Sequence, residues 1–345
     1  MLRHRGLYNP VIQTDTMEAR EFMKYVDIRR AQKGPTSQDI VTKVKDMFYD
    51  FHKLYGRDVL DPIWEKVGPA LAKNAGLAQF VLDYDGAVSD FFFPWLITIH
   101  TSPSLALEMA YGEGFDIKGR WRASDDDEID YFVRNDPTFV YNRERQLFVA
   151  DLVTSVRDAR PYRTKSKIVD LGAGRMAWGR WHGFEFLPAV QEILAFDIDP
   201  TIAPEKLFEP NPAEYGIAYH RVDIAKALGS SECEGASLVI LGGVASYYPP
   251  EVFESKIVEP VYELLKDGGA FFFDLQLDCP YYRRSVAVFD WPAMQLAKSA
   301  SAAIDTVEMI RQRLWSNDMK FSAEYALDTY NPEYPISVMV VLTKI

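Results

Sequence analysis

The sequence predicts an α/β fold with an open, mostly parallel sheet of seven strands, the last two of which form an antiparallel hairpin. Short apolar runs alternate with stretches of helical length from about residue 166 onward, which is typical of βαβ units. Several of these runs end in an acidic residue or a glycine, as strands do where they approach a ligand. Two final apolar runs flank the segment NPEYP, which favours a hairpin at the sheet edge.

The runs that precede the hairpin are predicted to be buried strands. Their length suits strands better than helices, and helix-length stretches separate them. Parallel neighbours need such crossover connections, so we expect these strands to lie side by side in one sheet. The predicted strands are residues 166–174, 192–200, 217–224, 235–243 and 268–277, and the hairpin comprises 320–330 and 336–345.

Helices are predicted both before and between the strands. Residues 141–159 read as a helix that ends before Pro161, and residues 249–269 read as an amphipathic helix that stops at a glycine pair. A long helix is predicted within 291–316. In contrast, 177–190 contains glycines and a proline, so we expect a short or irregular helix there.

Residues 1–139 are expected to form a separate, mainly α-helical domain that precedes a second domain at 140–345. Ile40, Val44 and Phe48 recur at helical spacing. The strongly apolar segment 77–112 is interrupted by prolines, and we expect helices there that are buried against the second domain, because so many large apolar side chains do not stay exposed.

The composition argues against several classes of function. The 345-residue chain has a formal net charge of −12, so it lacks the positive field that binding to a nucleic acid polymer requires. Its two cysteines and five scattered histidines do not supply the usual zinc ligands, and no metal site is predicted. The most apolar run, 91–100, is too short to span a bilayer. No apolar core follows the N-terminus, so we expect a cytoplasmic protein without membrane association.

Acidic residues and glycines gather where the first three predicted strands end. Asp170, Gly172 and Gly174 follow the first strand, where small residues let the backbone turn tightly and approach a ligand. Asp197 follows the second strand, where a carboxylate can accept both hydroxyls of a ribose, and Asp223 follows the third, where it can accept from an adenine amino group. The alternatives are a plain strand-to-helix turn for the glycines, a helix cap for Asp197, and a helix cap or surface acid for Asp223.

Taken together, these motifs resemble the class I S-adenosylmethionine-dependent methyltransferases, which have a Rossmann-like fold. In chain order, VDLGAGRM, FDIDP, RVDI, LVILGGVASYYPP and LLKDGGAFFFD are similar to successive motifs of that family, and the final hairpin resembles its sixth and seventh strands. The resemblance covers about residues 140–345. One departure is Met176, which stands where many members have a third glycine.

The resemblance implies S-adenosylmethionine as the cofactor. It implies that Asp170, Gly172 and Gly174 lie near the methionine part, Asp197 on the ribose and Asp223 near the adenine. Gly242, in the fourth motif, is assigned to the same cofactor site. A domain that precedes the sheet in this family often contacts the acceptor or forms a homodimer interface, which is the role we expect of residues 1–139.

The acceptor is expected to be a small molecule, because the fourth motif lacks the Asn/Asp-Pro-Pro-aromatic pattern of enzymes that methylate amino nitrogens of adenine or glutamine. Tyr247 and His182 are the candidate catalytic residues, although loop packing for the tyrosine and a surface role for the histidine are the alternatives. Trp178 either packs on the cofactor or covers the sheet.

Two other functions remain open on the sequence. A dinucleotide-dependent oxidoreductase, using NAD or NADP, would hold a pyrophosphate on the same glycines. Against it stand the acidic Asp170 directly before the glycines and the terminal hairpin. The second alternative is a protein that binds S-adenosylmethionine without transferring its methyl group.

Overall fold

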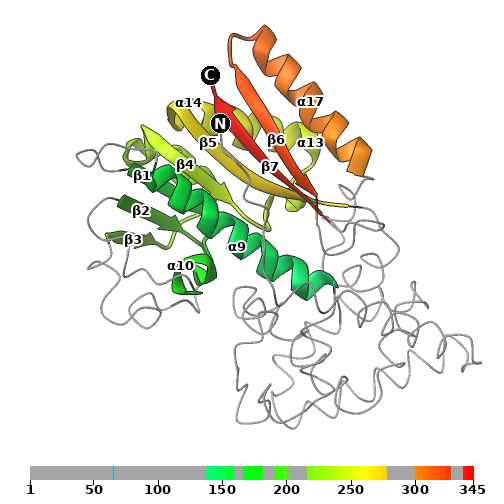
Figure 1. Ribbon diagram of the computed structural model, residues 1–345. Coiled ribbons are helices and arrows are strands. Elements are labelled where there is room, and N and C mark those ends of the chain that lie inside the picture. Colours follow the sequence, from blue (N-terminus) through cyan, green and yellow to red (C-terminus); the bar gives the residue numbers. More distant parts are fainter. Residues whose placement is uncertain are drawn as a thin grey trace, which may run out of the picture. The chain divides into compact units, whose positions relative to one another are not determined.

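The computed structural model describes residues 65, 137–158, 166–181, 191–199, 202, 216–277, 300–327 and 337–345. The predicted helical domain at 1–139 lies outside these residues, apart from Glu65 and the start of one helix. The described residues from Arg143 onward belong to one compact unit of the chain. Figure 1 shows the sheet and helices of this unit in colour.

A seven-stranded sheet forms the centre of the unit, in the order β3-β2-β1-β4-β5-β7-β6 (Figure 1). The first five strands run parallel, and β7 pairs antiparallel with both β5 and β6. This arrangement confirms the predicted fold class, including the terminal hairpin. The strands are β1 (Ser166–Leu171), β2 (Gln191–Phe196), β3 (Ile217–His220), β4 (Ala236–Leu241), β5 (Leu265–Gln276), β6 (Phe321–Leu327) and β7 (Ser337–Lys344).

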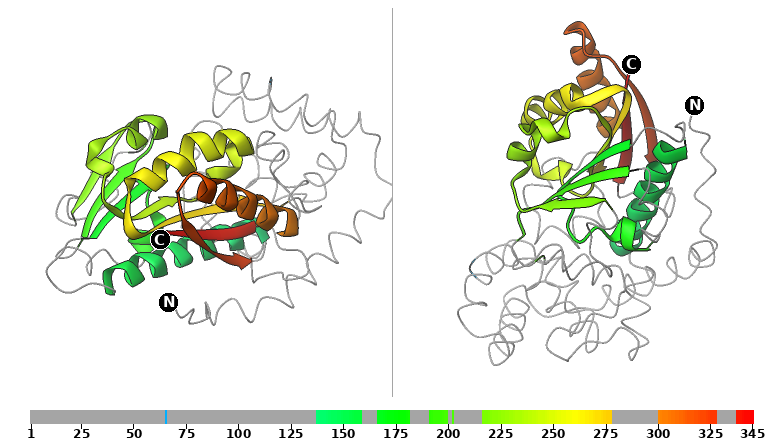
Figure 2. Two further views of the ribbon diagram at one scale, coloured as in Figure 1. Left: turned by 90° about the horizontal axis from the view of Figure 1, so that it is seen from above. Right: turned by 90° about the vertical axis from the view of Figure 1, so that its left-hand side faces the viewer.

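Helices lie on both faces of the sheet. Figure 2 shows α9 on one face and the helices that follow β3 and β4 on the other. The predicted helix at 141–159 is confirmed and begins four residues earlier, at Pro137. The helical segments are α9 (Pro137–Asp158), α10 (Ala177–Trp181), α12 (Ile224–Leu228), η3 (Ser231–Cys233), η4 (Ala245–Tyr247), α13 (Pro250–Phe253), η5 (Glu254–Val258), α14 (Glu259–Leu264) and α17 (Ala300–Ser316).

The central parallel strands β1, β2 and β4 are largely buried on both faces, which explains why they read as continuous apolar runs. All six residues of β4 are buried. Alternate residues such as Val169 and Leu171 belong to the core under α13, η5, α14 and α17. Their neighbours face α9, where the rings of Phe148 and Phe272 lie 5.5 Å apart. The neighbour Asp170 lies on this second face, as the period of two along a strand requires.

The helix predicted to stop at the glycine pair ends earlier than expected. Helix α14 ends at Leu264, and Gly268 and Gly269 lie within β5. Leu265 already pairs with Ala236 of β4, and the register shifts before the next pair, Leu238 with Ala270. Gly268, at φ +70°, takes up this irregularity in a conformation that suits glycine. The glycines therefore mark a bulge in the strand and not the end of the helix.

Candidate cofactor site

The candidate site lies where the parallel strands end, at the carboxyl edge of the sheet. In open α/β sheets this edge binds ligands at the point where the strand order reverses. Here the order reverses between β1 and β4, which are neighbours although β2 and β3 come between them in the sequence. The loops after β1, β2, β3 and β4 carry the acids and glycines that the sequence singled out.

The loop after β1 turns sharply over the end of β2. The amides of Gly172 and Ala173 both donate to the carbonyl oxygen of Phe196, at 2.8 and 2.9 Å. Gly172 and Gly174 have φ values of +68° and +54°, which glycine adopts readily. Met176, in the place of the family's third glycine, is also left-handed at φ +50° and is buried. The backbone thus keeps a glycine-like conformation at a methionine, which costs conformational energy.

Gly172 also marks a close approach between the loops after β1 and β4. A Cβ atom at Gly172 would lie 2.8 Å from Cγ2 of Val244 and 4.0 Å from Cδ1 of Ile224. Real Cβ contacts essentially never reach 2.8 Å, so only glycine fits here without a shift. Val244 and Ile224 therefore place an apolar surface directly beside the glycine loop.

Asp197 joins the end of β2 to the glycine loop. Its Oδ2 accepts the Gly174 amide at 2.8 Å, and its Oδ1 accepts the Asp199 amide at 2.8 Å. The side chain is half-buried, and burial raises its pKa while these backbone amides oppose the rise. Each carboxylate oxygen retains a second lone pair, so Asp197 can still accept hydroxyl donors. The neighbouring Ile198 is 66% exposed at the same loop.

Asp170 is a buried carboxyl group beside this loop. Its Oδ2 accepts a hydrogen bond from the indole Nε1 of Trp178 at 2.8 Å. Burial raises the pKa of Asp170 to about 7; the Trp178 hydrogen bond opposes the rise, and the charge of Asp197 adds to it. The main-chain amide of Trp178 donates to Oε1 of Gln146 on α9. Trp178 is thus buried and held between β1 and α9.

Tyr219, which the sequence analysis missed, completes the contacts of the loop. Its hydroxyl donates to the carbonyl oxygen of Gly174 at 2.7 Å. Burial raises the pKa of Tyr219, and the charges of Asp197, Asp170 and Asp199 add to the rise. The sequence does place a tyrosine in a predicted strand that follows two strands ending in acidic residues. Its hydrogen-bond partner, however, is a main-chain carbonyl oxygen, which a sequence pattern does not identify.

Asp223 caps a helix. It is the N-cap of α12, and its Oδ1 accepts the Ala225 amide at 2.7 Å. This is the alternative that the sequence left open, and the carboxylate is exposed at the carboxyl edge, where it can also accept from a ligand. Tyr248, from the loop after β4, lies close enough that the charge of Asp223 adds to the effect of burial in raising the phenol's pKa.

Gly242 and Gly243 pack against α9. A Cβ at Gly242 would lie 3.6 Å from Nε of Arg145, and one at Gly243 would lie 2.7 Å from its Nη1. Arg145 donates from Nη1 to Oδ2 of Asp274 at 3.1 Å, with both side chains buried, and the Gly243 amide donates to the other carboxylate oxygen. Gly242 thus borders a buried ion pair at the ends of β4 and β5.

Of the two candidate catalytic residues, the described part of the chain includes Tyr247 alone. Tyr247 is 46% exposed on η4. His182 lies outside the described residues, directly after α10. The described part of the predicted segment 177–190 contains the short helix α10, Ala177–Trp181.

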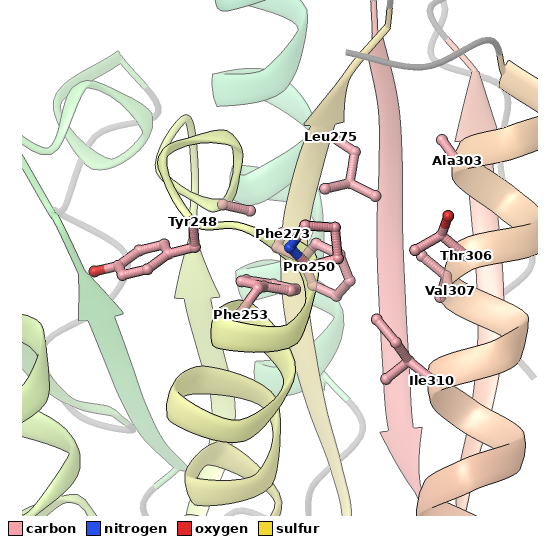
Figure 3. Close-up of a pocket in the computed structure, with 10 residues that line it drawn as sticks. Tyr248, Pro250, Phe253, Phe273, Leu275, Ala303, Thr306, Val307 and Ile310 are labelled. Carbon is pink, nitrogen blue, oxygen red and sulfur yellow. The ribbon is translucent and has the colours of Figure 1, made fainter. Parts of the chain in front are cut away.

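A small cavity lies beside the site, between α13 and α17 (Figure 3). Its volume is about 20 Å³, enough for a single water. Its lining is apolar apart from Thr306, whose hydroxyl donates to the Ala302 carbonyl. Figure 3 shows the ring of Tyr248 pointing away from the cavity. The cavity therefore offers no polar anchor for a ligand.

Among the residues that the structure describes, no group of His, Cys, Asp or Glu side chains is arranged to hold a metal ion. No helix in the same residues has both the length and the apolar character needed to cross a membrane.

Comparison with known proteins finds solved structures that are similar to this chain in fold. No protein-family model and no curated protein sequence matches the chain. A solved structure described as a possible exported protein from Bordetella parapertussis matches with a TM-score of 0.53 at 14% identity, covering 79% of this chain and 88% of that one. The N-methyltransferase NodS from Bradyrhizobium japonicum, in complex with S-adenosylhomocysteine, matches with a TM-score of 0.38 at 13% identity, covering 69% and 96%.

The methyltransferase domain of a bacterial Hen1 protein matches with a TM-score of 0.43 at 12% identity, covering 59% of this chain and 98% of that one. These last TM-scores are below 0.5, so the assignment of the fold rests on the strand order. The order β3-β2-β1-β4-β5-β7-β6 with an antiparallel β7 is the Rossmann-like fold of class I methyltransferases. The fold named by the resemblance is therefore present.

Proposed function

We propose that this protein is an S-adenosylmethionine-dependent methyltransferase that acts on a small-molecule acceptor. The observation that carries the proposal is the hydrogen bond from the Gly174 amide to Asp197, because it brings an acid at the end of β2 onto the glycine loop after β1. A carboxylate there can accept ribose hydroxyls while the loop approaches the methionine part. The strand order supports the same cofactor.

The chemistry of the residues fits a cationic cofactor. Asp197 lies against the glycine loop, and its charge is close enough to the buried Asp170 to add to the rise in that group's pKa. Negative charge at this place favours a sulfonium and an ammonium group and opposes a pyrophosphate. Val244 and Ile224, which lie against the Gly172 backbone, are proposed to provide an apolar surface for an adenine ring. Asp223, exposed at the end of β3, is proposed to accept from the adenine amino group.

When bound, S-adenosylmethionine would supply an electrophilic methyl group for in-line displacement: a lone pair of the acceptor would form the new bond to carbon, and the carbon–sulfur electrons would stay on sulfur. The cofactor supplies the electrophile, so the chain's own residues align the reactants and exclude water. Asp197 and the loop from Gly172 to Gly174 would hold the cofactor. Tyr247, exposed beyond β4, is proposed to contact the acceptor and, with His182, to accept a proton where the acceptor carries one.

An oxidoreductase that uses NAD or NADP is disfavoured by the sheet. The dinucleotide fold has six strands in the order 3-2-1-4-5-6, whereas here the antiparallel β7 stands between β5 and β6. Isothermal titration of the full chain with S-adenosylhomocysteine and with NADH separates the two. Binding of S-adenosylhomocysteine alone is expected; binding of NADH alone would overturn the proposal.

Turnover separates a transferase from a protein that only binds the cofactor. The assay follows release of S-adenosylhomocysteine from S-adenosylmethionine across a panel of phenols, amines and thiols. Release that depends on an acceptor is expected. Tight binding without release over the whole panel would favour the protein that binds without transfer.

We further propose that nucleic acid polymers are not acceptors. The net charge of −12 gives a field that repels polyanions. A salt titration with single-stranded and duplex DNA tests this point. Binding tighter than ~1 μM near physiological salt, beyond the usual nonspecific range, would contradict it.

The expected cytoplasmic setting and the role of residues 1–139 remain part of the proposal. Cys233, a free and buried cysteine, agrees with a reducing compartment, as does the low cysteine content. Residues 1–139 are proposed to cover the acceptor side or to form a homodimer interface. Light scattering of the full chain, compared with one that begins near residue 140, tests the dimer.

A further inference from the structure

The main chain at Gly174 is held from both sides. Its amide donates to Oδ2 of Asp197 at 2.8 Å, and its carbonyl accepts from the hydroxyl of Tyr219 at 2.7 Å. These groups belong to the peptide units before and after the Gly174 Cα, so together they fix its backbone at φ +54°. Asp197 belongs to the end of β2 and Tyr219 to β3.

The sheet register explains how Tyr219 reaches the loop. Asp170 pairs with Ala195, and Ala195 pairs with Tyr219, so these residues form one row across β1, β2 and β3. Side chains of paired residues lie on the same face of a sheet. Alanine in the middle of the row is small and buried, which leaves space for the phenol ring to extend toward the loop after β1.

The contact from Tyr219 offsets backbone strain in the glycine loop. Gly174 and Met176 are both left-handed, and for a methionine that conformation costs free energy that neighbouring contacts must offset. The Met176 amide donates to the Ala173 carbonyl at 3.0 Å, which closes the turn from within. Tyr219 supplies a contact from outside the loop, on a strand that is fixed by its pairing with β2.

The setting also keeps the phenol protonated. Burial and the carboxylates of Asp197, Asp170 and Asp199 raise the pKa of Tyr219, whereas Arg221 lowers it. The hydroxyl therefore remains a hydrogen-bond donor to the Gly174 carbonyl near neutral pH.

We propose that Tyr219 is a positioning residue for the cofactor: by holding the Gly174 carbonyl, it keeps the glycine loop in the conformation that binds S-adenosylmethionine. This inference rests on the proposed function. Tyr219 acts through the loop backbone and is given no contact with the reacting atoms. Neither the motif pattern nor the resemblance assigns it a role.

The test is Tyr219→Phe in the full chain, which removes one hydroxyl and keeps the ring. Loss of a neutral hydrogen bond predicts roughly 3- to 10-fold weaker binding of S-adenosylhomocysteine by isothermal titration. Tyr325→Phe is the matched control, because Tyr325 is also half-buried and its hydroxyl donates to Glu308 from β6, at the opposite edge of the sheet. The control should bind like the wild type.

Hydrogen exchange gives a readout that a general loss of stability would not produce. In Tyr219→Phe, exchange is expected to speed up for residues 172–178 and to stay unchanged for β4, residues 236–241. Equal binding by wild type and Tyr219→Phe would overturn the inference and leave the proposed function intact. So would equal weakening by both tyrosine variants. A wild type that does not bind S-adenosylhomocysteine would instead overturn the proposed function, and this inference with it.

Discussion

The indole of Trp178 donates a hydrogen bond to the carboxyl group of Asp170 across 2.8 Å in the interior of the protein. Asp170 lies here because it is the penultimate residue of β1 and its side chain lies on the face covered by α9 and α10. The loop between the two residues turns back through the left-handed Met176, so the pair closes the glycine loop onto the sheet. The stability of the glycine loop therefore depends on a buried acid.

Asp170→Asn should change how stability depends on pH. The pKa of Asp170 is raised to about 7 in the folded protein, above that of an unfolded aspartate, so between pH 4 and 7 the folded state binds the extra proton. The wild type therefore loses stability as pH rises through this window, as Asp170 ionises in its buried place. Asparagine keeps an acceptor for Trp178 and cannot ionise. In urea denaturation, the free energy of unfolding of the variant relative to that of the wild type should increase by on the order of 2 kcal/mol between pH 5 and pH 8. A difference that stays constant with pH would contradict the raised pKa.

Trp178→Phe should destabilise the protein by removing the donor to Asp170. A buried acceptor left without its partner costs about 1–3 kcal/mol, and the smaller ring adds a packing loss. Urea denaturation near pH 8, where the acid is charged, measures the effect. Trp315→Phe is the matched control, because Trp315 is 43% exposed on α17. If both variants lost the same stability, the hydrogen bond to Asp170 would be of no consequence.

The sequence predicted the strands and the edge where they end, because buried parallel strands read as apolar runs and their ends as acids and glycines. Asp170, Gly174 and Asp197 were placed together for that reason, and the structure joins Asp197 to Gly174 directly. Met176 was recognised as a departure, and its left-handed backbone shows how the chain accommodates it.

Other contacts could not be predicted from the sequence. The buried ion pair of Arg145 and Asp274 joins residues 129 positions apart, and the local sequence around one residue does not predict the other as its partner. Tyr219 acts on a carbonyl oxygen, which every residue carries. The early start of β5 at Leu265 follows from its pairing with β4, so the local glycine signal at Gly268 was misleading. Tertiary pairing overrides local signals at such places.

Asp197→Ala should weaken cofactor binding with the fold intact. The side chain offers charged acceptors, and hydrogen bonds to charged groups contribute about 1.5–3 kcal/mol, so the affinity for S-adenosylhomocysteine should fall ~10–150-fold. The change also releases the Gly174 amide, which adds to the loss. Calorimetric titration measures the affinity. Asp267→Ala, at an exposed position near the start of β5, should bind like the wild type. An Asp197→Ala protein with unchanged affinity would show that the ribose is bound elsewhere.

Gly172→Ala should disturb the loop in two ways. Alanine at φ +68° adopts a left-handed backbone at a cost of roughly 1–2 kcal/mol. Its Cβ would also lie 2.8 Å from Cγ2 of Val244, so one of the two loops must move. We expect a loss of stability in urea denaturation that exceeds the backbone cost alone, together with weaker binding of S-adenosylhomocysteine.

Two further variants separate these contributions. Gly235→Ala adds a Cβ at φ +73° with no heavy atom within 4 Å, so its loss of stability measures the backbone cost alone. The double variant Gly172→Ala, Val244→Ala removes the methyl group that the new Cβ would meet, so Gly172→Ala should cost less stability in a Val244→Ala background than in the wild type. If Gly172→Ala were no less stable than Gly235→Ala, and Val244→Ala restored nothing, the loops after β1 and β4 would not approach each other as closely as 2.8 Å implies.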